Sequence, residues 1–227
     1  MRKQGGFETV RSVLEPTLPV DLSAQQQRRR IVDAMIASVA EKTYTGTTIA
    51  DIVKHASVSR TTFYKRFPDK RTCFDAALEQ CVATLRATAA AAIDPGDPPP
   101  RAIHKATAAT LELLAAEPGL AHLVIGEAVN VEASALGRYR NELVPQVRAL
   151  WEPPGERAKL HSDPQLAFGR AQVLIFDKIV AGRAVELPRL LPEIVYLVVL
   201  PFGGHAVALE QSRLAAREIG AADGMAA

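Results

Sequence analysis

Residues 48–67 contain two helix-start signals close together, which is the strongest local constraint in the chain. Thr48 followed by Asp51 is a capping box, in which each side chain accepts a hydrogen bond from the other residue's backbone N–H. Ser59 is suited to cap a second helix a few residues later. The first helix can therefore be only about two turns long, and a tight turn at residues 57–59 must join it to the second.

The apolar residues of this segment recur at helical spacing. Ile49, Ile52, Val53 and Ala56 follow the i, i+3, i+4, i+7 pattern of an amphipathic helix. In the second helix, Phe63 and Phe67 fall on one face, and Pro68 ends it. The spacing predicts two short helices that turn one face each toward a common core.

Longer helices are predicted on both sides. Ser23 and Gln26 form a capping box that opens a helix ending near residues 44–46, and residues 1–23 are taken as an arm. Asp69 can cap a helix that starts at Lys70 and continues to about Ala92. Residues 94–100 hold four prolines and a glycine and must break it.

Beyond this break the pattern predicts further helices and no sheet. They span about 101–116, 118–129, 133–151, 164–182 and 192–216. Residues 194–200 are β-branched enough to form a buried strand, but their helical context favours a helix. Pro201, Gly203 and Gly204 predict a kink in the last one. The predicted fold is all-α.

Charge is unevenly distributed along the chain. Residues 24–72 contain ten Lys/Arg and four Asp/Glu, whereas residues 73–227 contain fourteen and eighteen. A basic segment beside a nearly neutral remainder is typical of a module that faces nucleic acid. On composition alone, a solvated basic face explains it equally well, and residues 25–30 could belong to a helix that binds nucleic acid or a membrane surface nonspecifically.

The sequence gives little support to several other classes of protein. The N-terminal stretch lacks a signal-peptide pattern, and the longest apolar runs are shorter than the roughly 20 residues that span a bilayer, so we expect a cytoplasmic protein without a membrane segment. Cys73 and Cys81 are expected to be packing residues, with no disulfide or metal site. No catalytic motif or phosphate-binding glycine loop is present, so we expect neither an enzyme nor a cofactor.

Helical geometry divides the second short helix into roles. With Phe63 and Phe67 turned inward, Thr61 and Lys65 fall on the opposite face, and Arg60 lies at the N-terminal tip. A helix of this kind fits the major groove of DNA, where these three would contact base edges. Thr62 and Tyr64 flank that face and are placed to meet phosphate oxygens. Lys70 adds charge beside helix-start amides that favour a phosphate.

Residues 48–70, TIADIVKHASVSRTTFYKRFPDK, resemble the DNA-binding segment of the tetracycline-repressor (TetR) family of bacterial regulators. The resemblance covers about residues 28–78. Matching positions are Thr48, Asp51, Ile52, Ala56, Val58, Ser59, Thr62, Tyr64, Phe67 and Lys70. It assigns phosphate contacts to Thr62, Tyr64 and Lys70, and we add Thr48 to this set. Ser57 stands where the family has a left-handed turn glycine, and Thr61 where it has glycine or alanine.

The resemblance implies a homodimer with a three-helix DNA-binding head (residues 24–72) and a helical effector-binding and dimerisation body (residues 73–227). Such a dimer binds a palindromic operator and is released by a small-molecule effector. The helices at about 164–182 and 192–216, which are apolar almost all round, are expected to form the dimer interface. The alternative interpretation is that they are ordinary interior helices of a monomer.

Polar and aromatic residues within the apolar middle helices are candidates for an effector pocket, although each one singly is better explained by a structural role. They are His122, Glu127, Asn130, Tyr139, Trp151 and Phe176. The alternative function is a helical ligand-binding protein or enzyme with a vestigial DNA-binding head.

Overall fold

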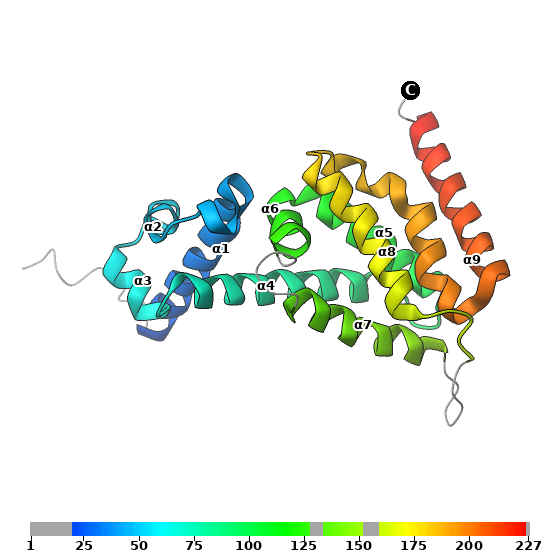
Figure 1. Ribbon diagram of the computed structural model, residues 1–227, viewed down its shortest axis with the longest axis horizontal. Coiled ribbons are helices and arrows are strands. Elements are labelled where there is room, and N and C mark those ends of the chain that lie inside the picture. The colour runs from blue at the N-terminus through cyan, green and yellow to red at the C-terminus, as the bar shows by residue number, and fades with distance from the viewer. Residues whose placement is uncertain (1–19, 128–133, 152–158, 226–227) are drawn as a thin grey trace, which may run out of the picture.

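The computed structural model describes residues 20–127, 134–151 and 159–225, and these parts of the chain are helical without a strand (Figure 1). The all-α prediction is confirmed, and residues 194–200 lie within a helix. The α-helices are α1 (Val20–Gly46), α2 (Ile49–Ala56), α3 (Arg60–Arg66), α4 (Lys70–Ala91), α5 (Pro99–Ala116), α6 (Pro118–Ala121), α7 (Ser134–Trp151), α8 (Pro164–Val180) and α9 (Leu191–Met225). A π-helical segment, η1 (His122–Glu127), follows α6, and a 3₁₀ helix, η2 (Ala184–Leu190), precedes α9.

Helices α1, α2 and α3 and the first turns of α4 form a small head around an apolar core. Ile31 and Met35 of α1 meet Ile52 of α2 and Phe63 of α3, and all four side chains have no exposed surface. The start of α4 closes this core, where the rings of Tyr44 and Phe74 lie 4.7 Å apart. The predicted inward faces of the two short helices are thus confirmed.

The predicted caps of the short helices are present. The Thr48 side chain accepts from the Asp51 backbone N–H at 3.2 Å, and Asp51 Oδ2 accepts from the Thr48 backbone N–H at 2.9 Å. Ser59 and Asp69 cap α3 and α4 in the same way. The Ser23 cap is wrong, because α1 begins at Val20 and places Ser23 inside its first turn, where serine is tolerated.

The turn between α2 and α3 has the left-handed backbone that the family glycine would supply. Ser57 has φ 50 and ψ 47, and its N–H bonds to the Lys54 and Val53 carbonyl oxygens. Left-handed backbone brings the Cβ of an L-residue close to the following carbonyl oxygen. The buried core beneath α2 and α3 holds the chain in this conformation.

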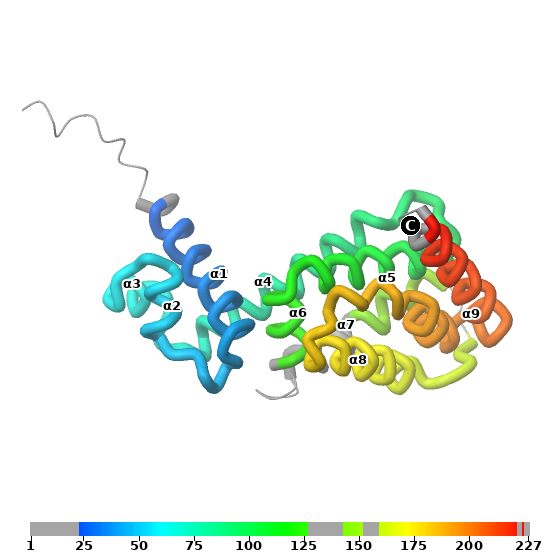
Figure 2. The backbone as a smooth tube through the Cα atoms, turned by 90° about the horizontal axis from the view of Figure 1, so that it is seen from above, coloured from blue at the N-terminus to red at the C-terminus, as the bar shows by residue number. Residues whose placement is uncertain are grey.

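Helix α4 runs from the head into the larger body, which α5 to α9 build (Figures 1 and 2). Helix α5 packs against α4 on one side and against α9 on another, and α8 packs against α9. Buried aliphatic residues of α5, η1 and α9 form the body core, including Leu111, Leu123 and Val195.

The body helices differ from their predicted bounds at three places. The predicted helix 118–129 is interrupted after α6 by the π-helical segment, in which Leu123, Val124 and Ile125 are all buried. The 3₁₀ helix η2 was not predicted. Helix α9 extends to Met225 rather than to residue 216, since residues 215–222 are rich in alanine.

Helix α9 is bent at Gly204, within the predicted kink. Gly204 has φ 73 and ψ 178, a conformation that only glycine adopts readily, and a Cβ there would lie 3.2 Å from the His161 ring.

The segment 184–221 is long and apolar enough to cross a membrane, and the bent segment 99–126 passes the same test as one unit; 44% of the most apolar window of 184–221 is buried within the fold. Such burial is typical of a core helix.

We expect Gly204→Ala to lower the free energy of unfolding by about 1–3 kcal/mol, because alanine disfavours this backbone conformation and its methyl group meets His161. Gly220→Ala is the matched control: it lies in the same helix with open space around it, and should be neutral or slightly stabilising. Urea unfolding of the two variants measures the difference, and equal midpoints would contradict the expectation.

We expect Ser57→Gly to raise the free energy of unfolding by about 0.5–1 kcal/mol, since glycine adopts the left-handed turn without steric cost. Ser59→Gly introduces glycine two positions later, at an N-cap with φ −76. It should lower stability, because the cap hydrogen bond is lost. Thermal unfolding followed by circular dichroism compares them. A stability loss in Ser57→Gly would show that the turn is not strained.

Candidate nucleic-acid interface and body cavity

Helix α3 presents a polar face to solvent on the side opposite its buried aromatic residue. Phe63 has no exposed surface, whereas Arg60, Thr61 and Lys65 are exposed. The helix is seven residues long, about two turns. The three predicted base-contacting residues therefore lie together on one accessible face, and their contacts with bases stay a prediction.

Two of the predicted phosphate contacts take part in helix N-caps, Thr48 as the cap of α2 and Thr62 as the residue bonded by the cap of α3. Thr48 is exposed, and its hydroxyl donates to Asp51 Oδ2 at 2.8 Å. The Thr62 hydroxyl lies 2.9 Å from that of Ser59, whose oxygen accepts from the Thr62 backbone N–H. Both hydroxyls sit at helix N-termini, where backbone amides favour an anion.

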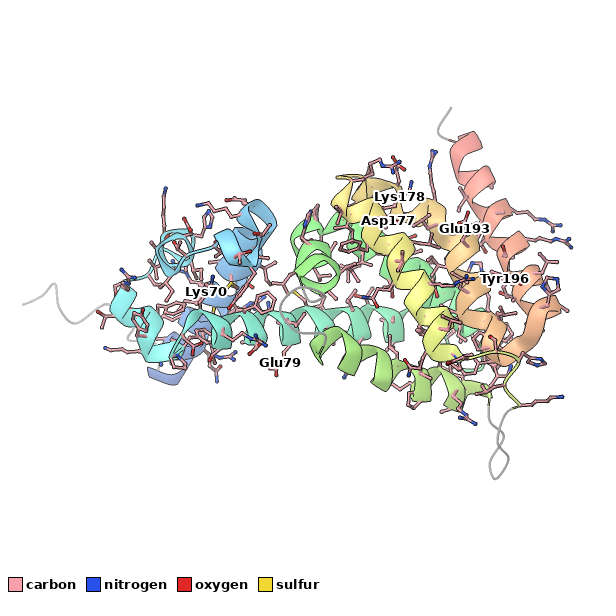
Figure 3. The ribbon with its side chains drawn as sticks, in the orientation of Figure 1. Lys70, Glu79, Asp177, Lys178, Glu193 and Tyr196 are labelled. Atoms are coloured by element: carbon pink, nitrogen blue, oxygen red, sulfur yellow. The ribbon has the colours of Figure 1, made fainter. Side chains whose placement is uncertain are left out.

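Tyr64 and Lys70 occupy different environments. Tyr64 is 49% exposed, and its ring meets Phe63 edge-on. Lys70, labelled in Figure 3, is part-buried: its Nζ donates to the Tyr44 and Thr47 carbonyl oxygens, each at 2.9 Å, and lies 4.3 Å from the centre of the Tyr44 ring. Lys70 thereby ties the end of α1 and the start of α2 to α4.

Helix α1 adds positive charge beside α3, which the α3-based assignment did not include. Arg28 and Arg30 are exposed; the Arg28 guanidinium lies 5.2 Å from the centre of the Phe67 ring, and Arg30 Nη2 donates to the Ser57 carbonyl oxygen at 3.4 Å. Gln27 accepts a hydrogen bond from Arg66 Nη2 at 3.1 Å. The basic run at residues 25–30, visible in the sequence, thus borders the same surface as α3.

Asp51 is the acidic group of this region, and it is paired. Lys42 Nζ donates to Asp51 Oδ1 at 2.6 Å. This bond, with those from Thr48, holds the pKa of Asp51 well below its usual range. The carboxylate is therefore committed to the cap of α2, and Lys42 offsets its charge near the basic face.

The body encloses a cavity of about 380 Å³ between α4, α5, η1, α7, α8 and α9. Ligand pockets typically measure roughly 300–1,000 Å³. Its walls are chiefly aliphatic, with Leu85 and Ala89 from α4 and Leu111 from α5 among them. Helix α4 therefore contributes to the head core at one end and to this cavity at the other.

The described lining of the cavity includes none of the predicted effector-pocket residues whose side chains are described. Trp151 stacks on Phe202 with ring centres 5.8 Å apart, and Phe176 is half-buried against the body core. His122 is half-buried in η1. Asn130 and the side chains of Glu127 and Tyr139 lie outside the described residues. None of the three described side chains lines the cavity, and the set as an effector pocket stays a prediction.

Helix α8 carries an exposed apolar stripe. Leu166, Val173 and Val180 recur every seven residues and are 65%, 57% and 62% exposed. Residues seven apart lie on the same face of a helix. A shallow groove between this face and Leu197 of α9 continues the apolar surface. We call Leu166, Val173 and Val180 the α8 stripe.

Both cysteines belong to α4 and are buried. Burial raises the pKa of the Cys73 and Cys81 thiols to about 12, so neither is reactive at neutral pH. Among the described residues, no group of three His, Cys, Asp or Glu side chains is arranged to hold a metal ion.

In comparisons with known proteins, a family match is found in the head and the first half of α4. Residues 31–77 match the family model described as bacterial regulatory proteins, tetR family. This range runs from the core of α1 through α2 and α3 into α4. No curated protein sequence is significantly similar to the chain.

Solved structures extend the likeness to the body. The regulator FadR from Bacillus subtilis, in complex with stearoyl-CoA, has a TM-score of 0.64 at 18% identity, covering 78% of this chain and 98% of its own. CprB, a TetR family protein from S. coelicolor A3(2), has a TM-score of 0.59 at 22% identity, with 86% and 99% covered. RolR in complex with resorcinol has a TM-score of 0.56 at 16% identity, with 85% and 95% covered.

Sequence identities this low show a shared fold only. The family match applies to residues 31–77 of the head. The head has the capped helix-turn-helix and its basic face, and the described body has the helical architecture of the same regulators. Residues 31–77 thus match the tetR family of bacterial regulatory proteins, and the chain shares its fold with solved structures of such regulators.

Proposed function

We propose that the chain represses transcription as a homodimer, binding a palindromic operator through two α3 helices and leaving it when a small molecule occupies the body cavity. The observation that carries this is the position of α4. The helix begins against the α1–α2 junction through Lys70 and later lines the cavity with Leu85 and Ala89. A ligand that shifts α4 alters the placement of the head.

The DNA-binding step uses the exposed face of α3. Arg60, Thr61 and Lys65 would contact base edges in the major groove, and Thr48, Thr62, Tyr64 and Lys70 would contact phosphates. Contacts to phosphate release counterions, so binding should weaken steeply as salt rises. This role places the protein in the cytoplasm.

The α8 stripe supports the dimer. Large apolar side chains exposed at every second turn of one face are costly in water, and a second copy of the chain would cover them. Helix α9 packs beside α8 and supplies Leu197 to the same surface. The α8 and α9 helices of two subunits would then form a four-helix interface.

The release step follows from differential affinity. The structures of FadR in complex with stearoyl-CoA and of RolR in complex with resorcinol support a ligand site in bodies of this fold. An effector acts only if it binds the DNA-released conformation more tightly than the DNA-bound one. The alternative, a ligand-binding protein or enzyme with a vestigial head, requires no operator.

Gel shifts on the DNA upstream of the gene separate these functions. We expect Arg60→Ala and Lys65→Ala each to cost about 1–3 kcal/mol of binding free energy on the cognate site and less on random DNA. Tyr64→Phe removes a phosphate-facing hydroxyl and should weaken both alike. Arg217→Ala, which removes an exposed charge from α9, is the control. No shift at low salt, or an unchanged shift in the Arg60/Lys65 double variant, would contradict the repressor function.

Light scattering after gel filtration tests the dimer. We expect Leu166→Glu with Val173→Glu to yield a monomer of 24.4 kDa, because two carboxylates would be desolvated at each interface. Operator affinity should fall as well when the dimer is lost. Ala83→Glu adds a charge at an exposed position of α4 and should leave the dimer intact. A dimer that survives both stripe substitutions would place the interface elsewhere.

A further inference from the structure

Two residues of opposite charge lie between the members of the α8 stripe. At about 100 degrees per residue, Arg170 and Asp177 fall within roughly 40 degrees of Leu166 around the helix. Both are exposed. Read from the N-terminal end of α8, this face is therefore apolar, positive, apolar, negative and apolar, formed by Leu166, Arg170, Val173, Asp177 and Val180.

Neither charge is paired within the subunit. Among the described residues, Arg170 and Asp177 have no hydrogen-bond or ion-pair partner. By contrast, Lys178, which follows Asp177 in the sequence, binds Glu186 of η2 (Figure 3). Arg170 also lines the shallow groove that α8 shares with Leu197 of α9. Both charges are therefore free to pair with groups that a partner brings to this apolar surface.

The order of these residues is complementary to itself in one orientation only. Leu166 and Val180 each lie seven residues from Val173. Arg170 lies three residues before Val173, and Asp177 lies four residues after it. When two copies of α8 pack antiparallel about a two-fold axis near Val173, each arginine meets an aspartate and the two ends of the stripe meet each other. In a parallel pair, each charge would face its own copy, and contacts between like charges are costly.

From this pattern we infer that α8 of one subunit packs antiparallel on α8 of a second copy, and that two equivalent ion pairs between Arg170 and Asp177 fix the register. This arrangement rests on the proposed homodimer and adds its orientation and the residues that select the partner. A different protein with a similar apolar face but no matching charges would leave Arg170 and Asp177 desolvated and unpaired, which disfavours its binding.

Helix α9 offers Arg170 a competing carboxylate. Glu193 is exposed in the first turn of α9, four residues before Leu197 (Figure 3). Residues 191–204, the part of α9 before the bend, contain no lysine or arginine. Packing of α8 on the partner's α9 would therefore pair Arg170 and leave Asp177 without a cation from that helix. The antiparallel α8 pair satisfies both charges at once.

Charge reversal followed by mixing tests the register in the full-length protein. Arg170→Asp and Asp177→Arg each create two contacts between like charges, so we expect each to raise the dimer dissociation constant about 100-fold or more in sedimentation equilibrium. An equimolar mixture of the two variants should form a heterodimer within about ten-fold of wild-type affinity, because each copy supplies the charge that the other needs. The double variant R170D/D177R should form a homodimer for the same reason.

Two control variants identify what the charges contact. Arg217→Asp reverses an exposed charge on the far part of α9 and should change the dissociation constant less than about two-fold. Glu193→Arg should not restore dimers when it is mixed with Arg170→Asp. If it does restore them, the partner of Arg170 lies on α9 and the antiparallel α8 pair is wrong.

The remaining outcomes keep this register apart from the proposed function. Dimers of wild-type affinity in both single variants, or weakened single variants whose mixture stays monomeric, would overturn the register. If Leu166→Glu with Val173→Glu still breaks that dimer, the proposed interface stands without the ion pairs. A monomeric wild-type protein would contradict the register and the homodimer together, whereas operator binding in gel shifts is measured independently of both.

Discussion

Burial of α4 along most of its length joins the two parts of the molecule. Phe74 and Leu78 close the head core, and Leu85 continues into the body beside the cavity. Interiors pack at near-crystalline density, so a buried helix cannot move at one end without displacing neighbours at the other. Lys70 strengthens the head end of this connection through two carbonyl oxygens and an aromatic ring. One helix therefore connects the head to the cavity of the body.

The head shows how local rules and tertiary packing cooperate. Thr48, Ser59 and Asp69 begin helices because each side chain replaces a missing backbone hydrogen-bond partner, which neighbouring residues decide. Ser57 is held in left-handed backbone although serine disfavours it, since Ile52 and Phe63 must both reach the core. This small strain orients α3 outward with Arg60, Thr61 and Lys65 exposed.

The cavity illustrates the opposite case. Its predicted residues were polar and aromatic because such side chains stand out in an apolar sequence; of these, Trp151 packs on Phe202 and does not line the described cavity. The actual lining is mostly leucine, isoleucine and alanine, residue types that also fill every core. Which of them face empty space depends on how helices far apart in the sequence diverge.

Sequence alone determined the features that depend on residues within one or two turns: the caps, the short helices, the break at residues 94–100 and the bend near Gly204. It also determined the helix-turn-helix, because its fold is set by closely spaced apolar and capping residues. Only the tertiary structure decided that Lys70 binds the α1–α2 junction, that α4 lines a cavity and that the α8 stripe is exposed. Those features arise from contacts between distant segments, and helical periodicity says which residues share a face but not what that face meets.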